Sequence, residues 1–230
     1  MEAVVLAGGF GTRLQALFPD VPKPMAPIRG RPFLEILLMT LARNGFSRVV
    51  LSLGYRAELI KSHFGNRFEQ MSLIYEIESV PLGTGGAIRA ALQHCLSDPV
   101  FVFNGDTYLD LEVAQVQAVW RRSQIPIIVA REVADTARFG RLQTDGDRVT
   151  GFLEKGLGGR GLINAGCYVL PRDALDHFEL GSHFSIETDY LERAVREQLI
   201  GLFITSSVFI DIGVPEDYQR AQILLAEQAR

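Results

Sequence analysis

The chain has 230 residues, of which 47% are hydrophobic and 22% are charged. This is the composition of a compact globular protein with one large domain or two small ones, and it excludes intrinsic disorder. Lysine and arginine number 23 against 27 acidic residues, which gives a formal net charge of -4. No broad basic surface for nucleic acid is expected, although a local basic cluster would suffice for a small anionic ligand.

Cysteine usage and the start of the sequence exclude further classes. Cys95 and Cys167 are far apart and outside any Cys-x-x-Cys or Cys/His cluster, so we expect two buried thiols rather than a disulfide framework or a zinc site. The first apolar run has no basic segment before it and stops at Gly8 and Gly9, too early for a signal peptide or a membrane span. We therefore expect a cytoplasmic protein that does not contact a membrane.

The first half of the chain alternates between strand and helix patterns. Short apolar runs predict strands at residues 3–6, 48–53, 72–77, 100–103 and 125–130. A helix is predicted over residues 33–43, where leucines recur at positions i, i+3, i+4 and i+7, and two more over 86–96 and 112–122. This alternation is typical of βαβ units in a parallel sheet.

The pattern changes after residue 125. Turn signals at 145–147 and 156–161 separate short strand-like pieces up to residue 170, which indicates antiparallel structure added to a parallel core. A helix at 185–198, a strand pair near 202–212 and a closing helix from Pro215 follow. Since no linker or repeat divides the chain, we expect one α/β domain over residues 1–230. It would be a Rossmann-like, mixed but mostly parallel sheet flanked by helices, with a small antiparallel lobe.

The first predicted strand runs into a glycine-rich segment, residues 7–14. In parallel α/β sheets ligands bind at the carboxyl ends of strands, and glycines there let backbone N–H groups approach phosphate oxygens. Arg13 adds a planar fork of donors with a fixed charge. The spacing fits neither the GxGxxG dinucleotide motif nor a P-loop. The segment predicts a triphosphate cradle, and the alternative is an ordinary glycine-containing turn.

Lys23 stands between two prolines, Pro22 and Pro24, which restrict the backbone on both sides and so orient the ammonium group. Between residues 10 and 31 four cations face a single acid, Asp20, against the balance of the whole chain. This cationic stretch suits an anionic ligand. The alternative is a solvated surface loop.

Two aspartates are candidates for a divalent metal site. Asp106 follows the predicted strand 100–103, and Asp211 stands between Ile210 and Ile212, where an unpaired carboxylate would be costly to bury. Carboxylates suit a hard cation such as Mg²⁺, and pairing the two across one ion would offset that cost. For Asp106 alone, a turn-forming role is the alternative.

These motifs resemble the signature of the nucleotidyltransferases that make nucleotide sugars from a sugar 1-phosphate and a nucleoside triphosphate. That signature, GGxGTRL followed by a PKP lysine, matches residues 8–14 and 22–24, and similar blocks continue to Asp217. The resemblance therefore covers nearly the whole chain. Within the family, segments 23–28, 81–87 and 209–218 are most similar to D-glycero-D-manno-heptose 1-phosphate guanylyltransferases.

The resemblance implies a role for each matching residue. Residues 1–123 would mainly bind the nucleotide and residues 124–230 mainly the sugar phosphate. The implied catalytic residues are Arg13, Lys23, Asp106 and Lys155; the Mg²⁺ ligands are Asp106 and Asp211; the nucleotide-binding residues are Leu6, Ala7, Gly8, Gly9, Gly11, Thr12, Glu78, Pro81, Gly83 and Thr84; and the sugar-binding residues are Gly140, Glu154, Lys155 and Asn164.

Two of these assignments have ordinary alternatives. A carboxylate at Glu78 suits the N1–H and N2 amino donors of guanine better than uracil or thymine, but a strand-end glutamate facing water is equally compatible. Glu154 and Lys155, taken without their neighbours, would be interpreted as a surface ion pair.

The implied reaction converts GTP and D-glycero-α-D-manno-heptose 1-phosphate into GDP-heptose and pyrophosphate for surface glycan biosynthesis, in a monomer or homodimer. Three alternatives stay open. The first is a uridylyl- or guanylyltransferase acting on mannose, glucose or N-acetylhexosamine 1-phosphate. The second is an inactive regulatory subunit that binds a nucleotide sugar. The third, a glycosyltransferase, is disfavoured because the sequence from Asp106 to Tyr108 lacks the second aspartate of a DxD motif.

Overall fold

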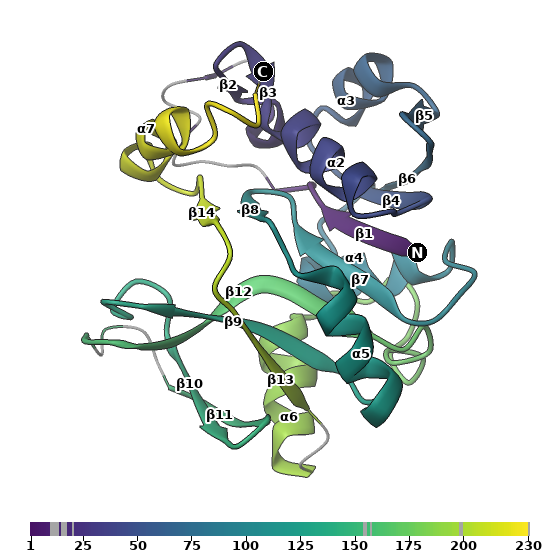
Figure 1. Ribbon diagram of the computed structural model, residues 1–230. Coiled ribbons are helices and arrows are strands. Elements are labelled where there is room, and N and C mark those ends of the chain that lie inside the picture. The colour runs from purple at the N-terminus through teal and green to yellow at the C-terminus, as the bar shows by residue number, and fades with distance from the viewer. Residues whose placement is uncertain are drawn as a thin grey trace.

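One mixed sheet contains ten strands within the part of the chain that the computed structural model describes, residues 1–9, 14, 18, 19, 21–153, 156, 158–197 and 200–229 (Figure 1). The strand order is β10-β11-β13-β9-β12-β7-β1-β4-β6-β5. Strand β1 pairs in parallel with β4 and β7, and β4 pairs in parallel with β6. In β1, β4 and β7 nearly every residue is buried, as expected of parallel strands covered on both faces. The bounds are Glu2–Leu6 (β1), Arg48–Leu53 (β4), Arg67–Phe68 (β5), Met71–Ile77 (β6) and Val100–Asn104 (β7).

The sheet continues past β7 through a strand of opposite direction. Strand β12 is antiparallel to both β7 and β9, and a bulge between Asn164 and Cys167 interrupts its pairing with β9. Strand β13 is parallel to β9, and β11 and β10 complete the sheet in antiparallel fashion. The predicted α/β class, with antiparallel structure in the second half, is confirmed. The bounds are Ile127–Val133 (β9), Arg141–Asp145 (β10), Arg148–Leu153 (β11), Gly161–Leu170 (β12) and Gly201–Thr205 (β13).

Alternate residues of the central strands point into two hydrophobic cores, one on each face of the sheet. Ala3 and Val5 share one core with α2, α3 and α5, whereas Val4 belongs to the other with α4 and α6. The four leucines that predicted α2 are all buried in the first core. The bounds are Phe33–Arg43 (α2), Ala57–Phe64 (α3), Gly83–Leu92 (α4), Val113–Ser123 (α5), Glu192–Ala194 (α6), with a π-helix at Ile186–Leu191 (η2) and a 3-10 turn at Val195–Glu197 (η3).

A third, smaller core joins the end of the chain to an early hairpin. Strand β14 (Phe209–Asp211) pairs with β8 (Thr107–Leu109), and the final helix α7 (Pro215–Leu224) packs beside the hairpin of β2 (Pro27–Ile28) and β3 (Arg31–Pro32) (Figure 1). Tyr218 of α7 shares this core with Ile28 and Ile210, and its hydroxyl donates to the Pro27 carbonyl oxygen. The packing brings β8, β14 and the residues before β2 to one end of the sheet.

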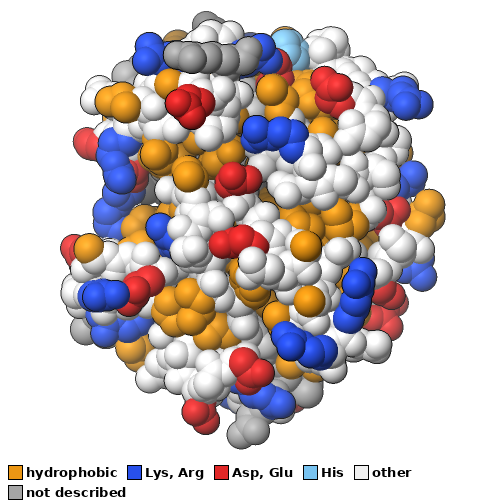
Figure 2. All heavy atoms as spheres, viewed as in Figure 1, with side chains coloured by type: hydrophobic (Ala, Val, Ile, Leu, Met, Phe, Trp, Pro, Cys, Tyr) orange, Lys and Arg blue, Asp and Glu red, His pale blue; other side chains and the backbone are white. Residues whose placement is uncertain are grey.

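Two further features are the charge pattern of the visible face (Figure 2) and the state of the two cysteines. On the face shown in Figure 2, basic and acidic side chains are interspersed among apolar ones, so the electrostatic field there is of mixed sign. Both cysteines are free and buried, as predicted, and burial raises the pKa of the Cys95 thiol to about 12. Among the described residues, no helix is long and apolar enough to cross a membrane.

Several predicted boundaries are wrong. Helix α4 begins at Gly83 rather than residue 86 and ends at Leu92 rather than 96, because the next residues form tight i→i+3 turns. The strand predicted at 125–130 lies at Ile127–Val133, where it pairs along β12. The helix predicted over 185–198 is the succession η2, α6 and η3, since apolar spacing does not specify which backbone groups bond.

The predicted strand pair near 202–212 is also wrong as a pair. Both strands exist, but β13 pairs with β9 and β11, whereas β14 pairs with β8. A strand pattern in the sequence identifies a half-buried extended segment without naming its partner.

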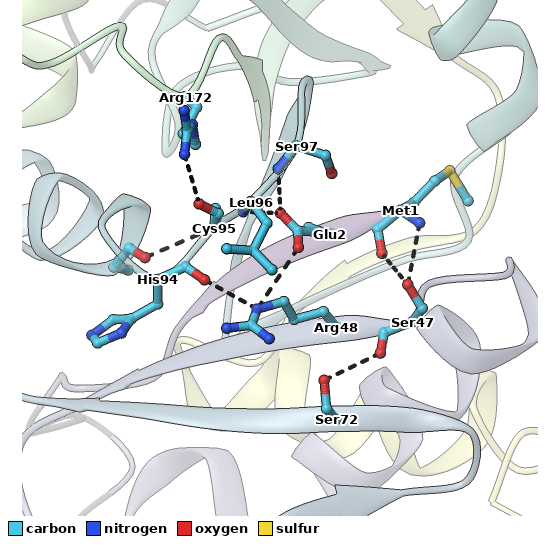
Figure 3. A network of polar contacts seen from close by, with 11 residues as sticks. Met1, Glu2, Ser47, Arg48, Ser72, His94, Cys95, Leu96, Ser97 and Arg172 are labelled. Carbon is cyan, nitrogen blue, oxygen red and sulfur yellow. Dashed lines mark hydrogen bonds and ion pairs between the residues drawn. The ribbon is translucent and has the colours of Figure 1, made fainter.

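A buried carboxylate fixes the amino-terminal end of β1 (Figure 3). Glu2 is only 6% exposed, and its Oε2 accepts hydrogen bonds from the backbone N–H groups of Leu96 and Ser97 at 2.6 and 3.0 Å. Its Oε1 lies 3.7 Å from Nε of Arg48, which donates to the carbonyl oxygen of His94 at 3.0 Å. The carboxylate thereby joins β1 and β4 to the segment after α4.

Glu2→Gln is expected to lower the free energy of unfolding by about 1–3 kcal/mol, because charge-assisted hydrogen bonds to a buried acceptor are lost or weakened. In a domain of this size each kcal/mol corresponds to about 2–4 °C of melting temperature. Thermal unfolding followed by circular dichroism measures the effect. Ser72→Ala is a matched control, since the Ser72 hydroxyl makes a long, exposed bond to Ser47. Equal melting temperatures for both variants would refute the role of Glu2.

Candidate active site

The carboxyl ends of the parallel strands open into a pocket of about 550 Å³. Leu6 lines it from the end of β1, Asp106 from the turn after β7, Gly54 from the turn after β4 and Glu78 from the end of β6. This is the edge at which open α/β sheets bind ligands.

Most of the predicted nucleotide-binding residues line this pocket, together with Lys23 and Asp106. Gly11, Thr12 and Arg13 lie outside the described residues, as do Glu154 and Lys155, so their positions stay predictions. The predicted residues that line the pocket are Leu6, Ala7, Gly8, Gly9, Lys23, Glu78, Pro81, Gly83, Thr84 and Asp106.

Two glycines are required by close packing of the strand ends. A Cβ on Gly105 would lie 2.6 Å from the carbonyl oxygen of Leu6, to which the Gly105 N–H donates at 2.8 Å. A Cβ on Gly8 would lie 3.0 Å from Oε1 of Glu78. The ends of β1, β6 and β7 are thereby held close together beneath the pocket, without room for side chains at these two positions.

The Glu78 carboxylate organises the loop before α4. Its Oε1 accepts a hydrogen bond from the Ser52 hydroxyl at 3.2 Å, and its Oε2 accepts one from the backbone N–H of Leu82 at 2.9 Å. Each oxygen keeps a second lone pair, so an additional contact with a base is compatible with this geometry. The loop-holding role of Glu78 was not anticipated from the sequence, and its contact with guanine stays a prediction.

The amino terminus of α4 is closed by the protein itself. The carbonyl oxygen of Phe184 accepts the N–H groups of Gly85 and Gly86 at 2.9 and 3.3 Å, and a Cβ on Gly85 would lie 2.2 Å from the Phe184 ring. Free helix N-termini commonly bind anions. Here two of those donors are already used, and Gly83 and Thr84 line the pocket instead.

Lys23, Asp106 and Asp211 come together from three distant parts of the chain. Lys23 begins the 3-10 turn Lys23–Met25 (η1), and its Nζ lies 2.5 Å from Oδ2 of Asp106. The pairing of β14 with β8 places Asp211 opposite Thr107, and the N–H of Ile212 donates to the carbonyl oxygen of Asp106 at 2.9 Å. The two aspartates predicted as metal ligands are therefore neighbours beside the pocket.

The electrostatics of this group favour a cation. Burial and the charge of Asp106 raise the pKa of Asp211, while Lys23 opposes that rise. Oδ1 of Asp211 accepts the N–H of Gly213 at 2.6 Å. Two adjacent carboxylates with partial compensation are oxygen donors of the kind that hard divalent ions prefer. Among the described residues, no group of three or more His, Cys, Asp or Glu side chains is arranged to hold a metal ion, so water or substrate oxygens would complete the coordination of a metal here.

The two described residues of the predicted sugar-binding set, Gly140 and Asn164, are not part of the pocket lining. Gly140, with φ of 77°, ends a turn in which its N–H donates to Thr136, between β9 and β10. Asn164 lies on β12, where a bulge leads to Gly166. A Cβ on Gly166 would lie 2.8 Å from Nδ2 of Asn104, which does line the pocket. Strand β12 therefore adjoins the pocket through Gly166, and sugar contacts by Gly140 and Asn164 stay predictions.

An ion pair not anticipated from the sequence joins two distant segments of the second half, close to Asp211. Nη2 of Arg138 lies 2.8 Å from Oδ2 of Asp217, which is 4% exposed and also pairs with Arg220. It fastens the turn that contains Gly140 to the start of α7. Asp217 had the local signal of an acid in a helix's first turn, but that signal does not name a partner.

Comparisons with known proteins identify the family. The sequence model of the family described as "Nucleotidyl transferase" matches residues 2–228. The D-glycero-alpha-D-manno-heptose 1-phosphate guanylyltransferases of Aneurinibacillus thermoaerophilus and Campylobacter jejuni are 38% and 39% identical over 224 and 219 residues, which is 96% and 95% of this chain and 97% of each relative. The crystal structure of HddC from Yersinia pseudotuberculosis, complexed with GMP-PN, has a TM-score of 0.86 at 38% identity and covers 96% of this chain and 98% of that chain. The chain therefore belongs to the nucleotidyl transferase family.

Proposed function

We propose that this protein makes GDP-D-glycero-α-D-manno-heptose and pyrophosphate from GTP and D-glycero-α-D-manno-heptose 1-phosphate. The observation that carries the proposal is the meeting of Lys23, Asp106 and Asp211 beside a pocket at the carboxyl ends of the parallel strands. Two relatives named for this activity align with nearly the whole chain. The proposal includes a cytoplasmic enzyme that is a monomer or homodimer.

The reaction joins two anions, so it needs charge neutralisation and alignment more than a strong base. The phosphate of the sugar has a second pKa of about 6, so its attacking oxygen is largely ionised at neutral pH. That oxygen forms a bond to the α-phosphorus of GTP while the bond to the departing pyrophosphate breaks in line. Lys23 supplies a fixed ammonium group at this point, and Arg13 and Lys155 are proposed to face the pyrophosphate and the sugar phosphate.

Asp106 and Asp211 are the residues that would hold a divalent ion. Enzymes of this family generally use such a metal, and we propose Mg²⁺ because both ligands are carboxylates. When bound, the ion would supply Lewis-acid polarisation and charge neutralisation at the phosphate oxygens. Lys23 lies beside these ligands and forms an ion pair with Asp106.

The two halves of the chain are assigned different substrates in this proposal. Residues 1–123 mainly bind GTP, with Glu78 and Thr84 on the side of the base, because both line the pocket that the parallel strands form. Residues 124–230 mainly bind the sugar phosphate, with Asn164 on β12, which adjoins the same pocket through Gly166, and Gly140 in the turn that Arg138 fastens to the start of α7. Glu154 belongs to the sugar side by its family-like motif.

The decisive experiment is a matrix of GTP, UTP, ATP and CTP against heptose, mannose, glucose and N-acetylhexosamine 1-phosphates, scored by pyrophosphate release. GTP with heptose 1-phosphate is expected to give the highest kcat/KM, by tenfold or more, since a site that hydrogen-bonds a base or hydroxyl rejects partners lacking those groups. Preference for mannose 1-phosphate would reassign the sugar, and preference for UTP would contradict the role of Glu78. No pyrophosphate from any pair would favour a regulatory nucleotide-sugar binder, and sugar transfer from a nucleotide sugar would favour a glycosyltransferase.

A further inference from the structure

A single carboxylate outside the residues assigned so far connects two parts of the molecule. One is the pocket lining at Thr84, which we call the nucleotide rim, and the other is β12, which carries Asn164 and which we call the sugar-side strand. Oε1 of Glu187 accepts the hydroxyl of Tyr168 at 2.8 Å. Its Oε2 accepts the hydroxyls of Thr84 at 2.9 Å and Ser185 at 3.0 Å. Three hydroxyl donors therefore converge on the two oxygens of this one side chain.

The direction of every hydrogen bond toward Glu187 is determined by backbone donors. The N–H of Gly166 donates to Oδ1 of Asn164 at 3.0 Å, so the amide nitrogen of Asn164 must face the Tyr168 hydroxyl, 2.7 Å away. Because an amide nitrogen only donates, the Tyr168 hydroxyl accepts a hydrogen bond from Asn164 and donates its own O–H to Glu187. On the other side the N–H of Ile186 donates to the Thr84 hydroxyl at 3.0 Å, which likewise leaves the Thr84 proton for Glu187. We call Thr84, Asn164, Tyr168, Ser185 and Glu187 the carboxylate network.

The two ends of the carboxylate network belong to different substrates in the proposed function. Thr84 lines the pocket at the start of α4. Asn164 stands at the bulge of β12, two residues before the Gly166 backbone that packs against Asn104. Tyr168 between them is fully buried, and burial together with the nearby charge of Glu187 raises its pKa, so it stays a donor. Glu187 therefore joins the nucleotide rim to the sugar-side strand through a chain of directed hydrogen bonds.

The backbone at Glu187 is itself fixed by an unusual turn. Glu187 lies in the first turn of the π-helix η2, where the Ser185 hydroxyl accepts the N–H groups of Glu187 and Thr188 at 3.2 and 3.3 Å. Oδ2 of Asp189 accepts the N–H of Ser185 at 2.7 Å in return. Reciprocal capping of this kind fixes the start of a helix, and π turns are frequent at functional sites.

We propose that Glu187 is a positioning residue that holds the nucleotide rim and the sugar-side strand at one spacing, so that binding of either substrate strengthens binding of the other. The identity of the two substrates rests on the proposed function, whereas the coupling rests on the carboxylate network. A ligand that orders one end of a directed network lowers the entropy cost of ordering the other end. Coupling between two sites commonly amounts to 5–150-fold in affinity.

Tyr168→Phe cuts the network on the sugar side and keeps the ring in place. The KM for the sugar phosphate is expected to rise about tenfold, the KM for GTP to change less than about twofold, and kcat to fall less than KM rises. Isothermal titration of the sugar phosphate, with and without the α,β-methylene analogue of GTP, gives the coupling factor as the ratio of the two Kd values. This factor is expected to fall toward one in Tyr168→Phe and in Glu187→Gln. The matched control is Tyr75→Phe on β6, which removes a hydrogen bond from the Tyr75 hydroxyl to the carbonyl oxygen of Gly65. This variant should retain wild-type coupling.

A network that only stabilises the fold would give a different result. Tyr168→Phe and Glu187→Gln would then lower the melting temperature while both KM values and the coupling factor stayed at wild-type values, and that outcome would overturn the proposal. Equal rises of both KM values with unchanged coupling would overturn it as well. If the substrate matrix identifies a pair other than GTP and heptose 1-phosphate, the same titrations with that pair test Glu187 although the proposed function has failed.

Discussion

Asp211→Asn is expected to lower kcat about 10³-fold and to raise the melting temperature. The loss of turnover follows because one of the two carboxylates that would hold the metal is gone, and a metal at such a site supplies several kcal/mol of charge stabilisation. The gain in stability follows from the pKa of Asp211, which burial and Asp106 raise above its unfolded value. A raised folded pKa means that the ionised carboxylate costs stability at every pH above it. The neutral amide removes that cost while keeping the shape of the side chain.

The dependence on pH provides the control for this explanation. Stability contributed by Asp211 is greatest below its unfolded pKa and is lost as pH rises through the folded pKa, so the gain in Asp211→Asn should be largest near pH 7 and shrink toward pH 4. Differential scanning calorimetry across that range measures it. Asp145→Asn, at the exposed last residue of β10, should change neither kcat nor melting temperature. A variant with near-normal kcat in Mg²⁺ would refute the metal assignment, and a melting temperature below wild type would refute the electrostatic one.

The local pattern of the sequence was sufficient for the central strands, for α2 and for the edge of the sheet that carries the site, although it missed α3 and predicted one regular helix over 185–198. The four leucines of α2 repeat at helical spacing and are buried as that spacing requires. Asp106 follows a buried strand, and the strand-end rule for α/β sheets places it at a ligand site. Asp211 was singled out because a carboxylate between two isoleucines is costly. The structure gives the reason for that neighbourhood: Ile210 and Ile212 belong to the core beneath α7.

What the sequence could not give is the choice of partner for each element. Strands β13 and β14 are close in the chain, yet they pair with β9 and β8 because the intervening turn carries the chain from the large sheet to the small one. The same limit applies to the Arg138–Asp217 ion pair and to the carboxylate network, whose members are ordinary polar residues in separate segments. The closed amino terminus of α4 is a further case, since nothing local to Gly85 and Gly86 shows that Phe184 occupies their N–H groups.

Lys23→Met is expected to lower kcat by about 10²–10³-fold, the usual cost of removing one charge-stabilising donor from a reaction of this kind. Methionine keeps the length and much of the volume of lysine, so the turn Lys23–Met25 and its buried Pro24 should persist. The Lys23 side chain is only 12% exposed, and its ammonium nitrogen lies 2.5 Å from Oδ2 of Asp106. Its removal therefore eliminates a positive charge fixed at the junction of the proposed phosphate and metal sites.

The same variant is expected to bind a divalent ion more tightly when no substrate is present. In the wild-type protein the ammonium group of Lys23 pairs with Asp106 and opposes the rise in the pKa of Asp211, so an incoming cation must replace or share this partner. Without Lys23 the two carboxylates would hold Mn²⁺ with a lower Kd, measurable by isothermal titration, while kcat falls. Lys61→Met, on the exposed face of α3, is the matched control for loss of a lysine. If Mn²⁺ binding weakens together with kcat, Lys23 organises the two carboxylates instead of competing for them. Because the two effects have opposite signs under competition, a general loss of folding cannot imitate the expected result.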